Sequence, residues 1–223
     1  AGGRSLATAG SNPWLVHLRI ALQDTGELAT CAGSLIGPSW VLTTASCIER
    51  ARFIWNRFGT LNVINPELVL EAGPATVRVH PDYNPVVGDN NIAFIQFNRY
   101  IHSTDGISPV RLEAAGSELP ATGSFCNFGE DDGAPGELLS CYDVELESQG
   151  NLALASSEDG RTTTFDVGAP LIADGVQVGF LVSPPGPNDQ SAGIFLRVGD
   201  YVPWLEEMTG YDLDGSDDVD SSD

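Results

Sequence analysis

The segment "CAGSLIGPSWVLTTASC", from Cys31 to Cys47, sets the expectation for the fold. Its apolar residues form two short runs on either side of Gly37 and Pro38, a pair that typically marks a tight turn. The segment therefore predicts two short β-strands joined by that turn. The cysteines at its two ends are typical of a disulfide framework in an exported protein.

Short apolar runs of the same kind recur along most of the chain, separated by Gly, Pro, Asn and Asp. They lie at residues 14–22, 52–59, 75–80, 91–97, 142–148, 175–183 and 193–198. Many short strands with regular turns predict an all-β sandwich or barrel. The clearest helical pattern is "DYVPWLEEM", in which Asp200 is the expected N-cap and apolar residues recur at helical spacing.

The charge of the chain is strongly one-sided. It has 223 residues, with 31 acidic and 10 basic side chains, for a net charge of −21. We expect no nucleic acid and no membrane surface as partners, because both are anionic. A basic protein partner and metal cations are attracted instead.

The last residues differ in composition from the rest. Residues 210–223 are rich in acids and show no period, so we expect a solvated, disordered acidic tail after a domain spanning residues 1–209. The stretch "DLDGSDD" resembles a calcium loop, but Gly215 comes too early for the EF-hand pattern. We expect weak calcium association through the tail, and neither a defined metal site nor a cofactor.

Eight motifs occur in the order of a trypsin/chymotrypsin-like serine protease domain, and the chain resembles that family from Pro13 to about Met208. The motifs are PWLVHL, CAGSLIGPSWVLTTASC, VHPDYN, DNNIAFIQF, FDVGAPL, GFLVS, AGIFLRV and YVPWLEE. The resemblance implies two six-stranded antiparallel β-barrels with a C-terminal helix, and an active site in the cleft between the barrels.

The resemblance also places the catalytic triad, and all three of its positions are substituted. The histidine position is Ser46, the aspartate position is Asn91 and the nucleophile position is Val167. A serine hydroxyl has no pKa suited to a general base, and valine has no nucleophilic atom. The sequence therefore predicts that the chain is not an enzyme.

Other positions of the expected cleft are altered as well. Phe165 replaces a glycine whose N–H helps to form the oxyanion hole in the family. Arg161 occupies the base of the specificity pocket, where it is an unsuitable floor for a basic side chain. Ser183-Pro184-Pro185 replaces the segment that pairs with substrate, and proline lacks the N–H needed for a main-chain bond.

Structural features of the family are retained. Cys31 and Cys47 match a family disulfide, whereas Cys126 and Cys141 are expected to pair across a local hairpin. Asp166 matches the residue that pairs with a new N-terminal amine in the family, so Ala1 is one candidate partner. The alternative is that Asp166 caps nearby backbone N–H groups.

Three remaining features carry weaker expectations. His17, His80 and His102 have no ligand partner in the sequence, and we expect structural roles for them. The acidic segment "GEDDGAPGE", residues 129–137, is an exposed turn and the place where a basic partner would bind the body of the protein.

Four hypotheses of function follow. The first is a secreted, non-catalytic serine protease homologue that acts as a binding or regulatory module: a cascade cofactor, a decoy or an innate-immune component. The second is a structural, storage or matrix protein with an acidic cation-binding surface. The others are a hydrolase with a rearranged site and a carrier of a small molecule in the altered cleft.

Overall fold

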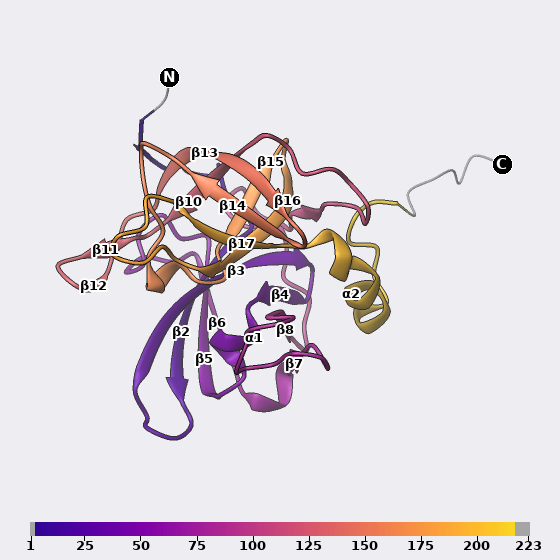
Figure 1. The fold of residues 1–223 in the computed structure, drawn as a ribbon. Coiled ribbons are helices and arrows are strands. Elements are labelled where there is room, and N and C mark those ends of the chain that lie inside the picture. The colour runs from indigo at the N-terminus through magenta and orange to yellow at the C-terminus, as the bar shows by residue number, and fades with distance from the viewer. Residues whose placement is uncertain (1–2, 217–223) are drawn as a thin grey trace.

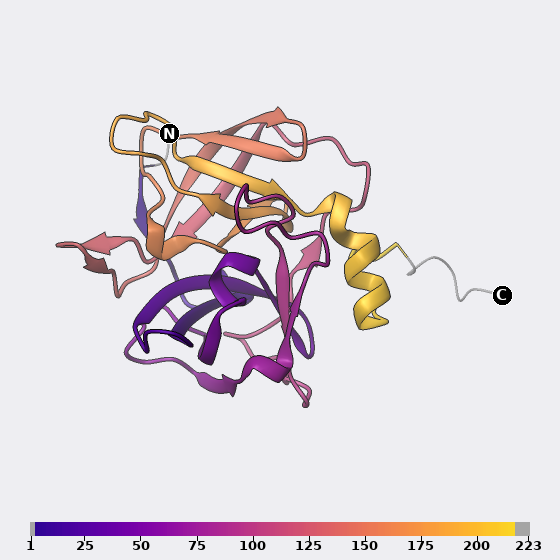
Figure 2. The same cartoon turned by 60° about the horizontal axis from the view of Figure 1, so that its bottom comes forward.

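The computed structural model describes residues 3–216, which form two stacked β-barrel-like sheets with a helix at one side (Figure 1). The expected all-β architecture with a C-terminal helix is thereby confirmed. The protruding hairpin of β11 (Glu130–Asp131) and β12 (Ala134–Pro135) and the helix α2 (Val202–Thr209) lie on opposite sides of the molecule (Figure 2). No helix in the described part of the chain is long and apolar enough to cross a membrane.

The first sheet contains the segment that opens the sequence analysis. Its seven strands, in spatial order, are β6 (Leu68–Ala72), β5 (Ala51–Phe58), β2 (Leu15–Leu22), β3 (Leu28–Gly37), β4 (Trp40–Thr43), β8 (Ala93–Gln96) and β7 (Val77–Val79). The expected turn at Gly37 and Pro38 joins β3 to β4.

The expected closure of this sheet into a six-stranded barrel is not found. Within residues 3–216, β6 pairs with β5 and β7 pairs with β8, but β6 and β7 do not pair with each other. The chain between them makes a 3₁₀ turn, Pro74–Thr76, and proline has no N–H with which to continue a ladder. The sheet is therefore an open half-barrel.

The second sheet closes on itself. Its six strands, in order, are β13 (Ser140–Gln149), β10 (Thr122–Asn127), β15 (Pro170–Ala173), β16 (Val176–Ser183), β17 (Gly193–Arg197) and β14 (Leu152–Ser156), and β14 pairs back to β13. Two short strands add to this barrel: β1 (Ser5–Leu6) pairs with β13, and β9 (Arg111–Leu112) pairs with β16.

Both expected disulfides are present. Cys31 in β3 is bonded to Cys47, and Cys126 in β10 is bonded to Cys141 in β13. Cys126 and Cys141 are direct partners in the antiparallel register of β10 and β13, as the expected hairpin requires. The segment between them carries the β11–β12 hairpin.

A shared apolar core joins the two sheets to the C-terminal helix. Phe94 of the first sheet, Phe180 of the second and Leu205 of α2 belong to one cluster and are fully buried. The expected cap at Asp200 is wrong: the chain makes a 3₁₀ turn at Gly199–Tyr201 first, so α2 starts after Tyr201, which makes no side-chain cap. The helix ends at Thr209 and is capped by Gly210, whose φ of 68° is the left-handed conformation that glycine adopts readily.

The expected acidic tail begins with one residue that is packed into the core. Leu213 is 3% exposed and belongs to the same core cluster. Its carbonyl accepts a hydrogen bond from the Leu112 N–H, and its N–H donates to a carboxylate oxygen of Glu206. The burial of one leucine therefore extends the folded domain past Gly210, to at least Leu213. Residues 217–223 of the expected tail lie outside the described residues.

Candidate active site

The expected histidine position lies on a short helix that the sequence did not predict. Helix α1 (Ala45–Ile48) begins after Thr44, whose Oγ1 accepts a hydrogen bond from the Cys47 N–H at 3.2 Å. Ser46 is exposed on this helix, and its hydroxyl donates to Thr44 Oγ1 at 3.0 Å. The disulfide from Cys47 to Cys31 holds the helix against β3.

Ser46 and Asn91 lie together, as the motif positions predicted. The Ser46 N–H donates to Asn91 Oδ1 at 2.8 Å, and Asn91 Nδ2 donates to Ser46 Oγ at 3.1 Å. Asn91 is buried, with 9% of its surface exposed, two residues before β8 begins at Ala93. Both ends of the carboxamide are therefore occupied by one serine, and the pair contains no group that titrates near neutral pH.

Val167 lies at the junction of the two sheets. Its side chain packs against the cores of both, its carbonyl accepts a hydrogen bond from the Ala32 N–H at 2.9 Å, and the same oxygen is 3.7 Å from Cys47 Sγ. The next residue must be glycine, because Gly168 has a φ of 91° and a Cβ there would lie 2.1 Å from the Ala32 carbonyl oxygen. The backbone therefore bends sharply at Gly168, although the preceding residue, Val167, has an apolar side chain.

Phe165 is held in a 3₁₀ turn, Thr164–Asp166, just before Val167. The Phe165 N–H donates to Thr163 Oγ1 at 3.2 Å. An oxyanion hole needs an N–H that points freely at the reacting carbonyl. The N–H at the position expected for this role is instead used inside the turn.

Asp166 is a buried carboxylate with a full set of donors. It accepts hydrogen bonds from the Thr163 N–H, Thr163 Oγ1 and Asn127 Nδ2 on Oδ2, and from the Gly129 N–H on Oδ1. Burial raises the pKa of Asp166, whereas these hydrogen bonds favour the charged form. Local capping, the second of the two expectations for Asp166, is what the described residues contain. Ala1 lies outside the described residues.

The guanidinium of Arg4 is linked to the Asp166 carboxylate through the side chain of Asn127. Arg4 donates from Nε to Ser140 Oγ at 2.5 Å and from a terminal nitrogen to Asn127 Oδ1 at 2.6 Å. Its guanidinium also lies 5.3 Å from the centre of the Tyr142 ring, within the range of a cation–π contact. The roles of Arg4, Asn127 and Thr163 were not predicted, because each depends on contacts between distant segments.

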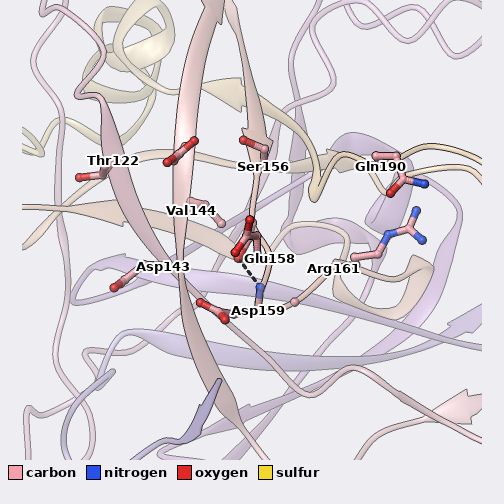
Figure 3. Close-up of a pocket in the computed structure, with 11 residues that line it drawn as sticks. Thr122, Asp143, Val144, Ser156, Glu158, Asp159, Arg161 and Gln190 are labelled. Carbon is pink, nitrogen blue, oxygen red and sulfur yellow. Dashed lines mark hydrogen bonds between the residues drawn. The ribbon is translucent and has the colours of Figure 1, made fainter. Parts of the chain in front are cut away.

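Arg161 does not form the floor of a deep pocket. Its side chain is exposed, and its guanidinium donates to the backbone carbonyls of Gly186 and Asp189. Together with Gln190 it borders an open hollow of about 1090 Å³ on the second barrel (Figure 3). Strand β16 ends at Ser183, immediately before the two prolines that were expected to interrupt pairing with a peptide.

The carboxylates of this hollow come from β13 and from the loop after β14. Asp143, Glu158 and Asp159 lie on one side of it, and Arg161 and Gln190 on the other (Figure 3). All five side chains are exposed. The hollow is therefore acidic, polar and open to solvent.

The three histidines are engaged elsewhere or exposed. His17 is 3% exposed, its Nδ1 lies 3.3 Å from an Arg57 nitrogen, and burial together with Arg57 lowers its pKa to about 3. His80 accepts a hydrogen bond from the Asp82 N–H and packs against the rings of Tyr201 and Trp204. His102 is exposed.

One cluster of acids in the described residues could hold a metal ion. Oxygens of Glu206, Asp212 and Asp214 all lie within 4.8 Å of one another, at the end of α2 and the start of the tail. Oxygen ligands of this kind suit calcium. The cluster falls where the sequence predicted weak calcium association, and it is half-buried rather than fully solvated.

The sequence matches a known protein family. The model of the family described as trypsin matches residues 1–205.

The chain belongs to the trypsin family.

Individual relatives agree with this assignment. Brachyurin of Leptuca pugilator is 28% identical, with 89% of this chain and 95% of that protein covered. Chymotrypsin of Phaedon cochleariae is 30% identical, with 88% and 77% covered. A solved structure of HL collagenase superposes with a TM-score of 0.83 at 22% identity, covering 94% of this chain and 98% of that one, which supports the chymotrypsin-like fold.

Proposed function

We propose that this chain is a non-catalytic member of the trypsin family that acts as a binding or regulatory module: a cascade cofactor, a decoy or an innate-immune component. The observation that carries the proposal is the pairing of Ser46 with Asn91. At the positions expected to hold a base and its orienting acid, the Asn91 carboxamide accepts from the Ser46 backbone N–H and donates to the Ser46 hydroxyl.

Serine protease chemistry needs a base that removes the proton of the nucleophile. In the expected positions neither Ser46 nor Asn91 has a suitable pKa, and Val167 offers no proton to remove. The Phe165 N–H, already bonded to Thr163 Oγ1, adds no oxyanion stabilisation. These losses act on different steps of the reaction, so no single neighbouring group compensates for all of them.

Secretion and a protein partner belong to the same proposal. The two disulfides fit an oxidising compartment such as the extracellular space. The net charge of −21 favours a basic partner over nucleic acid or anionic lipid. The scaffold keeps its core and its disulfides, although the reacting groups are lost. Its surface can therefore still bind a partner protein.

The experiment is a hydrolysis assay with a broad mixture of peptide substrates, followed by mass spectrometry. We expect no cleavage above the buffer control, whereas an active trypsin-family enzyme cleaves in parallel. The matched variant is Ser46→His, Asn91→Asp and Val167→Ser together. Cleavage by the wild-type chain, abolished by Ser46→Ala, would contradict the proposal.

The alternative is a structural, storage or matrix protein with an acidic cation-binding surface. Its support is the net charge together with the carboxylates of Glu206, Asp212 and Asp214. Saturable, stoichiometric capture of one purified protein from the native fluid would favour the binding module. Bulk uptake of cations without a protein partner would favour the alternative.

A further inference from the structure

A second hollow, of about 450 Å³, lies beside the β11–β12 hairpin and differs in chemistry from the one in Figure 3. We call it the hairpin groove, and define it by the lining residues Leu6, Phe128, Glu130, Asp131, Glu137 and Leu138. It includes part of the acidic segment 129–137, where the sequence placed a basic partner. The hairpin that borders it protrudes from the body in both views (Figures 1 and 2).

The hairpin groove exposes apolar side chains. Leu6 is 67% exposed and Leu138 is 53% exposed, although both lie on backbone that is fixed by hydrogen bonds. Leu6 in β1 pairs with Ser140, and Leu138 forms a bridge with Asn62. Both leucines are held in place and open to water. Burying them under a partner would therefore be favourable.

The charges of the groove are acidic. Glu130, Asp131 and Glu137 are exposed beside the two leucines. The basic residue in the lining, Arg4, is exposed and donates hydrogen bonds to Ser140 Oγ and Asn127 Oδ1. The groove therefore combines apolar anchors with three carboxylates against one arginine, an excess of negative charge.

The hollow of Figure 3 carries comparable charge without the anchors. Asp143, Glu145, Glu158 and Asp159 line it, but its one large apolar lining residue, Val144, is only 2% exposed. It attracts cations by charge alone, and attraction of that kind is weak in salt. Comparing binding at the two hollows therefore separates general attraction by charge from recognition that also uses apolar contacts.

We propose that the hairpin groove docks a segment of a partner protein that carries leucine-like side chains together with arginine or lysine. The inference rests on the proposed function as a binding module, for which it supplies the surface and the chemistry of the partner. A second copy of this chain is disfavoured as the occupant, because two bodies of net charge −21 repel each other. Apolar contacts would provide the affinity, and the acids would select basic segments.

The test uses the full chain and a fluorescent synthetic peptide that alternates leucine and arginine, with binding followed by anisotropy. We expect saturable binding that protects residues 128–138 from hydrogen exchange. Leu6→Ser with Leu138→Ser should weaken binding about tenfold, since about 1.4 kcal/mol of apolar contact is lost. Asp131→Asn should weaken it in low salt while leaving the apolar contacts intact.

The matched control is Asp143→Asn with Glu158→Gln, which removes the same kind of charge from the hollow of Figure 3. We expect its affinity to stay within about twofold of wild type. Equal losses in the control and the leucine variant, an absence of saturable binding, or protection centred on residues 156–161 would each overturn the inference. Cleavage of the peptide, read by mass spectrometry in the same samples, would instead contradict the proposed non-catalytic function.

Discussion

Acid should destabilise this protein through His17 in particular. The ring of His17 lies edge-on to Phe128 at 5.2 Å between centroids, and its Nδ1 faces a guanidinium nitrogen of Arg57 at 3.3 Å. A guanidinium can only donate, so Nδ1 must accept and the imidazole must be neutral. Protonation of His17 in the folded state would remove this hydrogen bond and bury a charge.

The magnitude follows from the two pKa values. The pKa of His17 is lowered from 6.5 to about 3 by burial and by Arg57. Between these values the unfolded chain binds one proton more than the folded chain, so stability is present at neutral pH and falls as the pH falls. Lowering the pH from about 7 to about 4 should cost about 3 kcal/mol of unfolding free energy from this residue alone.

The assay is urea unfolding of wild type and His17→Gln at both pH values. Glutamine can still offer an oxygen to Arg57 but does not titrate, and the carboxylates titrate equally in both proteins. The unfolding free energy of wild type should fall about 3 kcal/mol further than that of the variant. Equal decreases for the two proteins would refute the assigned state of His17.

Three other outcomes can be measured by thermal and urea unfolding. Arg4→Gln should cost about 2 kcal/mol by removing two charged hydrogen bonds and a cation–π contact, whereas Arg52→Gln, on an exposed side chain, should cost less than about 0.5 kcal/mol. Leu213→Ala should cost about 2 to 4 kcal/mol if the start of the tail belongs to the core, and a cost near zero would show that it does not. Millimolar calcium should raise the melting temperature of wild type slightly and that of Asp214→Asn less, and equal shifts would contradict binding at this cluster.

The sequence predicted the strand framework because apolar periodicity and turn residues are local signals. The turn at Gly37 and Pro38 and the opposition of Cys126 to Cys141 follow from such signals, and the structure contains both. The open edge of the first sheet could not be predicted in this way, since it depends on how β6 and β7, which follow each other in the chain, pair with different neighbours. Asp200 was misplaced because an added 3₁₀ turn moves the start of α2 by one residue beyond it.

Two features, the burial of Leu213 and the turn at Phe165, could not be predicted from the types of residue in the sequence. Leu213 was overlooked because acids surround it, although its burial and its hydrogen bonds to Leu112 and Glu206 hold the segment against the domain. The motif positions brought Ser46 and Asn91 together correctly. The engagement of the Phe165 N–H with Thr163 depends on a turn geometry that residue types alone do not specify.

The central claim, that the chain has no serine nucleophile, is tested most directly by reaction with a fluorophosphonate probe followed by intact mass measurement. An active trypsin-family enzyme mixed into the same sample serves as the internal control and should be fully labelled. The account predicts that this chain keeps its unmodified mass under those conditions. A stoichiometric adduct on any of its serines, Ser46 included, would contradict it.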